Sequence, residues 1–221
     1  MPKQRFESLL ANYCAPALKQ YKYANMFHLP KDDDSIRSFI KQYNQQFNSK
    51  GIFFILIEQE TQYTIYVYNS KLKDYISSNA VQNFLKSYQY PNTFELCIQE
   101  LKKRLNTKNF PHEIGVFLGY PLDDVIGFIE HKPYYLVGDW KVYQNVNEAK
   151  KQFDLFKQTK TSVYKGYKQD KIEMRGDRAE MSDFPLYLNM VASGLDCRDQ
   201  AISGFSFVVK IYAVPVVEII G

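Results

Sequence analysis

Residues 110–129 read F-P-H-E-I-G-V-F-L-G-Y-P-L-D-D-V-I-G-F-I, a stretch that combines turn-forming residues with an apolar face. Pro111 suits the first turn of a helix, because the N–H group that proline lacks has no helical partner there. The apolar residues that follow recur with the spacing of one helical face: Ile114, Phe117 and Leu118. Gly119 is expected to adopt a positive φ, which ends a helix at little steric cost. The stretch therefore predicts a helix from about Pro111 to Gly119.

A second helix is expected directly after this corner, because Pro121 stops the first helix and Asp123 or Asp124 can open the next one. The apolar residues of the second helix would be Val125, Ile126, Phe128 and Ile129. Two helices at a corner also occur in DNA-binding proteins, where the second helix brings basic or amide side chains to the DNA. Here that helix carries Asp123, Asp124 and Glu130, and carboxylates repel phosphate. The sequence therefore favours a structural corner at 111–130 over DNA binding, and nucleic acid is not expected as a partner.

Length and composition are typical of a globular protein. The 221 residues are enough to bury a core as one domain, or as one domain with an appendage. The 18 Tyr and 16 Phe are expected to serve mainly in packing. The net charge of +4 is too small to indicate a nucleic-acid partner by itself.

The three cysteines, Cys14, Cys97 and Cys197, lack the paired spacing of a disulfide framework or a zinc knuckle. Unpaired thiols are typical of a reducing cytoplasm. No apolar run approaches the roughly twenty residues that cross a bilayer, and residues 1–10 lack the apolar segment of a signal peptide. We therefore expect a cytoplasmic protein without a membrane partner.

Hydrophobic periodicity predicts an α+β fold. Besides the corner, apolar residues at helical spacing indicate helices near 6–13, 36–47, 71–88, 93–106 and from Asn147 to about Tyr164. Two β-rich runs, 52–57 and 63–68, are expected to form a hairpin whose first strand is central. A second hairpin is expected at 134–143, with Gly138 and Asp139 as its two-residue turn. The prediction is a small, mostly antiparallel sheet of two hairpins packed with about six helices, plus a strand-rich C-terminal extension.

The charge balance changes near Gln169. Residues 170–221 contain five basic and eight acidic residues, a net charge of −3, whereas residues 1–169 contain 23 and 16, a net charge of +7. We therefore divide the chain into an α+β domain at 1–169 and an extension at 170–221. Strand-like runs at 184–191 and 205–220 would need partners in a sheet.

Three blocks of the sequence resemble one protein family. The first is C-A-P-A-L at 14–18 with Lys22, Ala24, Asn25 and Phe27; the second is H-E-I-G-V-F-L-G-Y-P-L-D-D-V-I-G-F-I at 112–129; the third is W-K-V-Y at 140–143 before a helix with Ala149, Lys150 and Phe153. On these blocks, residues 6–168 resemble the bacterial family called domain of unknown function 3793 (DUF3793). Members of that family often have Gly where this chain has Gln20 and Pro where it has Tyr23. The resemblance implies an uncharacterised bacterial protein and brings no activity with it.

The residues best suited to chemistry are Cys14 and His112, which lie in the first two blocks, and we expect them to border one pocket. An imidazole near a thiol favours loss of the thiol proton, and the thiolate is then a nucleophile. Further residues of the same blocks would bind a ligand beside this pair: Lys22, Asn25, Glu113 and Tyr120. The alternative is that Cys14 is a small buried residue and that His112 caps a helix.

A metal site is not expected, because the candidate ligands lack local ligand spacing: Cys14, His28, His112 and His131. The sequence has no phosphate-binding loop and no dinucleotide fingerprint, so it identifies no cofactor. Two classes of function remain. The first is a cytosolic thiol-dependent enzyme or small-ligand binder that uses Cys14 and His112. The second is a non-catalytic interaction or regulatory module, so the partner would be a small molecule or a protein.

Overall fold

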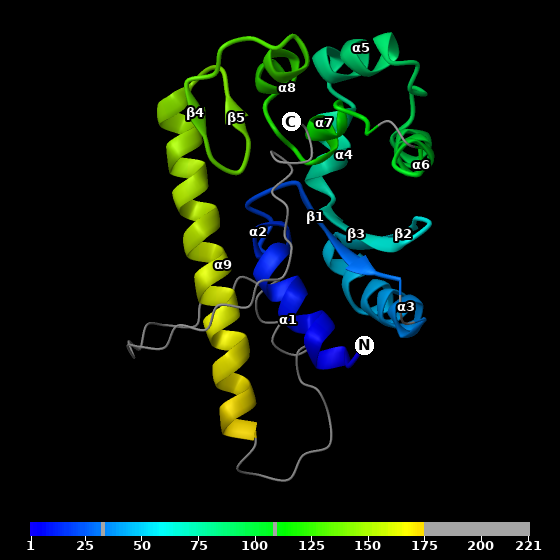
Figure 1. Ribbon diagram of the computed structural model, residues 1–221, viewed down its shortest axis with the longest axis vertical. Helices are drawn as coiled ribbons and strands as arrows, with labels where there is room; N and C mark the ends of the chain where they lie inside the picture. The colour runs from blue at the N-terminus through cyan, green and yellow to red at the C-terminus, as the bar shows by residue number, and fades with distance from the viewer. Residues whose placement is uncertain (32–33, 108–109, 175–221) are drawn as a thin grey trace.

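The computed structural model describes residues 1–31, 34–107 and 110–174, with side chains described to residue 168. It has the α+β fold that the sequence predicts, with a three-stranded and a two-stranded sheet among helices (Figure 1). The described helices are α1 (Lys3–Tyr13), α2 (Ala15–Leu18), α3 (Ser35–Phe47), α4 (Lys71–Ile76), α5 (Asn79–Ser87), α6 (Phe94–Arg104), α7 (Ile114–Phe117), α8 (Leu122–Ile129) and α9 (Val146–Met174), with a short 3-10 helix at Asn48–Lys50. The described strands are β1 (Ala24–Pro30), β2 (Ile52–Glu58), β3 (Gln62–Asn69), β4 (Leu136–Val137) and β5 (Lys141–Val142).

The larger sheet is antiparallel and has the strand order β1-β3-β2. β2 and β3 form the predicted hairpin, but the expectation that the first of these strands is central is wrong. β1, which the sequence analysis missed, pairs with the other edge of β3 along its whole length from Ala24 to Pro30. β3 is therefore the central strand.

β2 lies at the edge of the sheet in spite of its apolar sequence, because α3 supports it. Asn44 of α3 donates from Nδ2 to the Phe54 carbonyl oxygen at 2.8 Å, and the Phe54 N–H donates to Asn44 Oδ1 at 2.8 Å. At Phe54 the amide thus makes the pair of hydrogen bonds that another strand would make. An apolar run is for this reason a poor guide to which strand is central.

The larger sheet separates two apolar clusters, because alternate side chains of a strand point to opposite faces. The first cluster packs one face against α1 and α3 and includes Phe6, Leu10, Phe27, Tyr43, Phe54 and Ile65. The second cluster packs the other face against α4 to α8 and includes Ile57, Tyr66, Leu72, Leu101, Phe117 and Trp140.

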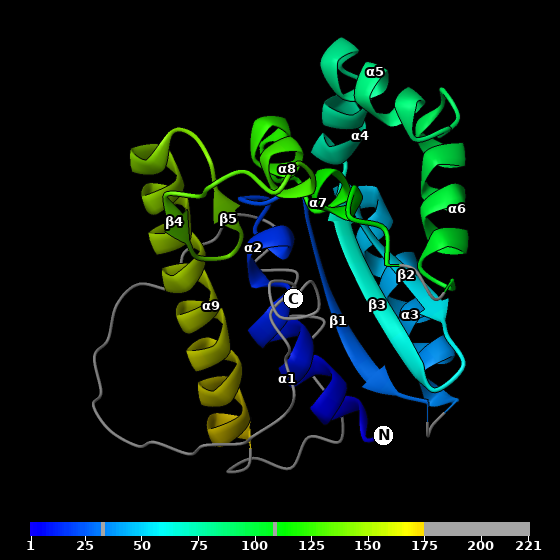
Figure 2. The same ribbon diagram turned by 45° about the horizontal axis from the view of Figure 1, so that its top comes forward.

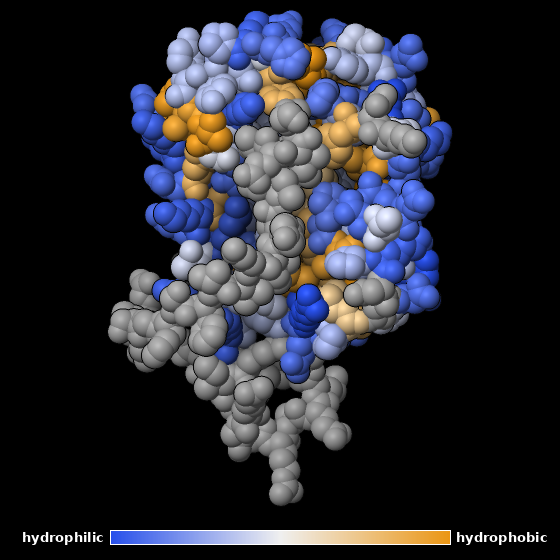
Figure 3. Space-filling view, viewed as in Figure 1, coloured by the Kyte–Doolittle hydropathy of each residue, from blue (hydrophilic) through white to orange (hydrophobic). Residues whose placement is uncertain are grey.

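Helix α9 contributes to both clusters. Figure 1 and Figure 2 show α1 and α2 between α9 and the larger sheet. Val163 and Tyr167 of α9 enter the first cluster, whereas Ala149 and Phe156 enter the second. Hydrophilic residues cover most of the described surface on the face seen in Figure 3. None of the described helices has the length and apolar character needed to cross a membrane.

The central corner has the predicted course with a shorter first helix. The Ile114 N–H donates to the Pro111 carbonyl oxygen at 3.1 Å in a turn, and α7 itself has only four residues. Gly119 has φ +75°, so the predicted positive φ is confirmed. The Gly119 and Tyr120 N–H groups donate to carbonyl oxygens of α7, as expected where a left-handed residue ends a helix.

β4 and β5 form the second predicted hairpin, but its loop is longer than expected. Val137 pairs with Lys141, which leaves three residues in the loop instead of two. The additional residue is Trp140, which is buried in the second cluster. Gly138 allows close packing, since a Cβ atom there would overlap the Phe153 ring.

Two predicted helices differ in extent from those observed. Residues 71–88 form α4 and α5 instead of one helix, because Ser78 has an extended backbone with ψ 145°. α9 begins at Val146, one residue before the predicted cap at Asn147, and continues beyond Tyr164 to Met174. The strand-like runs of the C-terminal extension lie outside the described residues.

The domain boundary near Gln169 stays a prediction, which truncation tests. We expect a chain that ends at Gln169 to unfold in one cooperative transition, because Val163 and Tyr167 already anchor α9 in the first cluster. Tyr167 also donates from its hydroxyl to the Gln4 carbonyl oxygen at 2.7 Å. Urea denaturation followed by circular dichroism measures the transition. If the shortened chain shows none, residues 170–221 are part of the core.

Candidate functional site

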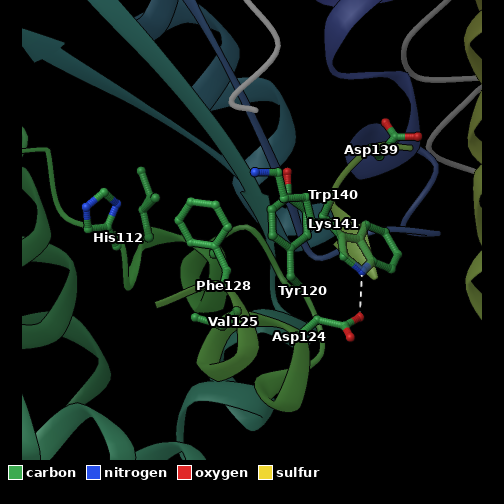
Figure 4. A pocket seen from close by; sticks show the side chains of 10 residues that line it. His112, Tyr120, Asp124, Val125, Phe128, Asp139, Trp140 and Lys141 are labelled. Carbon is green, nitrogen blue, oxygen red and sulfur yellow. Dashed lines mark hydrogen bonds between the residues drawn. The ribbon is translucent and has the colours of Figure 1, made fainter. Parts of the chain in front are cut away.

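A cavity of about 50 Å³ lies between the α7–α8 corner and the loop of the β4–β5 hairpin. Figure 4 shows it from close by. The corner and the hairpin loop are both held by the second cluster, so the walls of the cavity belong to the packed part of the fold. Its walls include His112, Tyr120, Phe128, Asp139, Trp140 and Lys141.

Aromatic rings form most of these walls. Tyr120 stacks on Trp140 with ring centroids 5.1 Å apart, and Phe153 meets Trp140 edge-on at 4.5 Å. The His112 ring lies 5.7 Å from the Phe128 ring. Figure 4 shows the rings of His112, Phe128, Tyr120 and Trp140 in a row. Walls of this kind suit a flat apolar group.

Asp124 holds the hairpin loop against α8. It is 3% exposed, and its Oδ2 accepts a hydrogen bond from Trp140 Nε1 at 2.7 Å, drawn as the dashed line in Figure 4. Its Oδ1 accepts from the N–H groups of Tyr143 at 2.7 Å and Gln144 at 3.2 Å. Because three donors already occupy this carboxylate, Asp124 positions Trp140 and is not available to a ligand.

Asp139 and Lys141 also bring charges to the cavity, and of these two only Asp139 forms an ion pair among the described residues. Asp139 Oδ1 accepts a hydrogen bond from Lys160 Nζ at 2.8 Å, so the ammonium of this α9 residue balances the charge of the carboxylate. Lys141 Nζ lies over the rings of Phe128 at 5.2 Å and Tyr134 at 5.3 Å. Within the described part of the chain, no carboxylate pairs with Lys141. The cavity therefore presents a cation to which no described carboxylate is bonded.

Lys22 lies behind the cavity wall, beside Tyr120. Its Nζ is 4.9 Å from the centroid of the Tyr120 ring and 5.8 Å from that of Phe156, and the residue is only 7% exposed. Burial lowers the pKa of this amine to about 8, while the Asp139 carboxylate raises it and Lys160 lowers it. Lysine seldom lies so deep in a protein without a paired charge.

We expect Lys22→Met to stabilise the protein at pH 7 by about 2 kcal/mol, because folding then no longer buries a protonated amine. Between pH 8 and 10.5 the unfolded wild-type chain holds a proton at Lys22 that the folded chain has lost, so wild-type stability rises with pH there. The advantage of the variant should accordingly shrink over that range. Urea denaturation at a series of pH values measures it. The exposed Lys103→Met is the control, and an equal pH dependence in both variants would contradict the expectation.

Cys14 and His112 have different surroundings. Cys14 is fully buried in the first cluster, between α1 and α2, whereas His112 is exposed at the cavity. Burial raises the pKa of the Cys14 thiol, although Lys22 and Lys160 act in the opposite direction. This environment favours the neutral thiol over the thiolate. A reactive role for Cys14 stays a prediction.

Asn25 and Glu113 are buried and hydrogen-bonded within the fold. Asn25 Oδ1 accepts from the Ala17 N–H at 3.1 Å, which ties α2 to β1. Glu113 accepts from the Tyr90 hydroxyl at 3.0 Å and from Arg104 Nη1 at 3.0 Å. Both side chains thus have hydrogen-bond partners within the fold that explain their burial. Their role in ligand binding stays a prediction.

Of the residues singled out in the sequence, the structure brings His112 and Tyr120 to one cavity and places Lys22 beside Tyr120. Sequence reasoning missed Asp124, Phe128, Asp139, Trp140 and Lys141 as parts of this site. The W-K-V-Y block was the signal for two of them, because it places the chain's single tryptophan next to a lysine. Among the described residues, no three His, Cys, Asp or Glu side chains gather to hold a metal ion.

Comparison with known proteins agrees with the resemblance seen in the three blocks. The model of a family described as protein of unknown function (DUF3793) matches residues 10–174, well over half of the chain. No curated protein and no solved structure matches the chain significantly. The matched residues contain the whole described sheet and every residue of the cavity wall. The chain therefore belongs to the DUF3793 family.

Proposed function

We propose that this protein binds a small anionic ligand that carries a flat apolar group, in the cavity walled by Tyr120, Trp140 and Lys141. The observation that carries the proposal is the Lys141 ammonium among aromatic walls, which no described carboxylate bonds, at a site where Asp124 and Asp139 already accept hydrogen bonds from the protein. An ammonium beside a carboxylate or phosphate makes a charge-assisted hydrogen bond. His112 can add a hydrogen bond at the open side, since a neutral or charged imidazole has at least one donor.

The size of the cavity limits what it can hold. Pockets for drug-sized ligands have volumes of about 300–1,000 Å³, whereas this one has about 50 Å³. The cavity therefore receives one end of a ligand, such as a ring with its acidic group, and the rest of a larger ligand would extend past the exposed His112 into solvent. We place this activity in the bacterial cytoplasm, a proposal supported by the free thiols of Cys14 and Cys97 and by the family resemblance.

A thiol-dependent reaction at Cys14 has less support than ligand binding. The thiolate would have to form in the first cluster, where burial opposes loss of the proton. Binding at the cavity requires no such change.

Trp140 makes the proposal testable without labels, because it is the only tryptophan in the chain and forms part of the wall. We expect benzoate to change Trp140 fluorescence in a saturable way, and the uncharged benzyl alcohol to bind more weakly. Lys141→Met should weaken benzoate binding about tenfold, because it removes a charge-assisted hydrogen bond worth roughly 1.5 kcal/mol.

Lys103→Met on α6 is the matched control, since this lysine is exposed and is not part of the cavity wall. It should bind benzoate as the wild type does. The proposal is wrong if benzoate causes no saturable change in fluorescence, or if both lysine variants bind it equally well.

A protein-binding role is the second candidate, and the exposed Tyr135 favours it. This residue is 76% exposed beside the hairpin, and tyrosine is enriched in protein interfaces. Tyr135→Ser should then abolish the capture of a partner from a bacterial extract while leaving benzoate binding unchanged. Loss of benzoate binding in this variant would instead assign Tyr135 to the ligand site.

A further inference from the structure

Lys22 is a buried lysine that takes no part in the anion-binding proposal. It is only 7% exposed, and no hydrogen bond or ion pair of its Nζ exists within the part of the chain that the structure describes. The nearby carboxylate of Asp139 accepts its hydrogen bond from Lys160 at 2.8 Å. A charged amine in such a place is costly, because burial removes most of its hydration.

The backbone of Lys22 is hydrogen-bonded at both its N–H and its carbonyl oxygen. The Lys22 N–H donates to the Pro16 carbonyl oxygen at 3.1 Å. Its carbonyl oxygen accepts from Nδ2 of the fully buried Asn69 at 2.7 Å. The rings of Tyr120 and Phe156 flank the amine. Functional groups in proteins are commonly held by packing of this kind.

We propose that Lys22 is a carbonyl-reactive amine, which binds a small aldehyde or ketone covalently as an imine. The lone pair of Nζ adds to the carbonyl carbon, and the carbonyl oxygen takes up a proton to give a carbinolamine. Loss of that oxygen as water, with the second proton from nitrogen, forms the C=N bond. No oxidant or reductant is consumed, and hydrolysis reverses the reaction. The proposal does not depend on anion binding at Lys141.

The charge state of Lys22 supports this chemistry. The groups that act on its amine are Asp139, which raises its pKa, Lys160, which lowers it, and Cys14, which raises it, and burial outweighs them all to give a pKa of about 8. At pH 7 an amine with this pKa is neutral roughly 300 times more often than one at the ordinary value of 10.5. Desolvation in an apolar setting activates lysine nucleophiles in this manner.

The reaction can be tested with acetaldehyde and sodium cyanoborohydride, which reduces an imine to a stable ethylamine. The full-length protein is treated briefly at pH 7 and digested, and each lysine is scored by mass spectrometry. We expect Lys22 to be labelled at least tenfold faster than the exposed Lys103, in spite of its restricted access. The ratio of the Lys22 rate to the Lys103 rate should fall as the pH rises above 8, because an ordinary lysine then gains the neutral fraction that Lys22 already has.

Two variants separate reactivity from structure. Lys22→Arg keeps a cation at this position but should lose the rapid label. Lys160→Met should slow labelling of Lys22, because it removes a nearby positive charge and frees the Asp139 carboxylate, and both changes raise the pKa of Lys22. The proposal is overturned if Lys22 reacts no faster than Lys103, or if it reacts only after urea unfolds the protein. It is also overturned if the ratio of the two labelling rates stays constant as the pH rises above 8. Benzoate binding, read from Trp140, is a separate measurement, so failure of one proposal is distinguishable from failure of the other.

Discussion

Asp124→Ala is expected to lower the free energy of unfolding by about 4 kcal/mol, since it leaves three donors at one buried position without their acceptor. Trp140 Nε1 and the N–H of Tyr143 lose bonds of 2.7 Å, and the N–H of Gln144 loses one of 3.2 Å. A buried donor without a partner costs roughly 1–3 kcal/mol. Urea denaturation, followed by both Trp140 fluorescence and circular dichroism, measures the change.

Asp123→Ala is a close control for this experiment. Asp123 is the adjacent acidic residue in the first turn of α8, but it is exposed. Its loss should remove only a favourable interaction with the helix dipole, of about 0.5 kcal/mol. Asp124→Asn should fall between the two, because its amide oxygen keeps one acceptor. Equal losses in the two alanine variants would mean that Asp124 does not hold the hairpin loop.

Gly119→Val is expected to destabilise the protein by about 3 kcal/mol, because two separate costs arise at one position. The first cost is conformational, since a β-branched residue tolerates φ +75° poorly. The second cost is steric, because a Cβ atom at Gly119 would lie 2.7 Å from Cδ2 of Tyr23. The same denaturation experiment measures the total.

A double-mutant cycle with Tyr23→Gly separates the two costs. In the Tyr23→Gly background the steric cost should disappear, because both the ring of Tyr23 and its Cβ atom, which would lie 2.8 Å from the added Cβ, are gone. The cost of the positive φ should remain. Gly119→Asn gives an independent comparison, because asparagine tolerates the left-handed region better than valine does. If Gly119→Val is neutral in the wild-type background, the corner does not require the backbone conformation found at Gly119.

The elements that could be predicted from the sequence are those with a local cause. The periodicity of α3, the β2–β3 hairpin and the positive φ of Gly119 each follow from residues close together in the chain. β1 could not be found in this way, because A-N-M-F-H-L-P lacks a clean alternation and becomes a strand by pairing with β3, some forty positions later.

In the candidate site, too, residues of one sequence motif could be predicted, whereas contacts between distant parts of the chain could not. His112 and Tyr120 lie in one motif, and the sequence pointed to both. Asp124 has the sequence signature of an exposed residue in a first helical turn, and it is buried only because Trp140 reaches it from the hairpin. Lys22 is likewise buried beside the rings of Tyr120 and Phe156, which are distant from it in sequence. Proximity of this kind is a property of the assembled fold.

The amide of Asn44 has a consequence for how the protein behaves among other copies of itself. The outer edge of an apolar strand is a template on which a second chain can add, and this is a common start of aggregation. By bonding both the N–H and the carbonyl oxygen of Phe54, Asn44 occupies the middle of that edge. It also fixes α3 to one residue of β2, so that the strand cannot slip by one position and turn its buried side chains outward. We therefore expect Asn44→Ala to make β2, the most apolar strand of the larger sheet, more prone to self-association, which light scattering of the two proteins at equal concentration would measure.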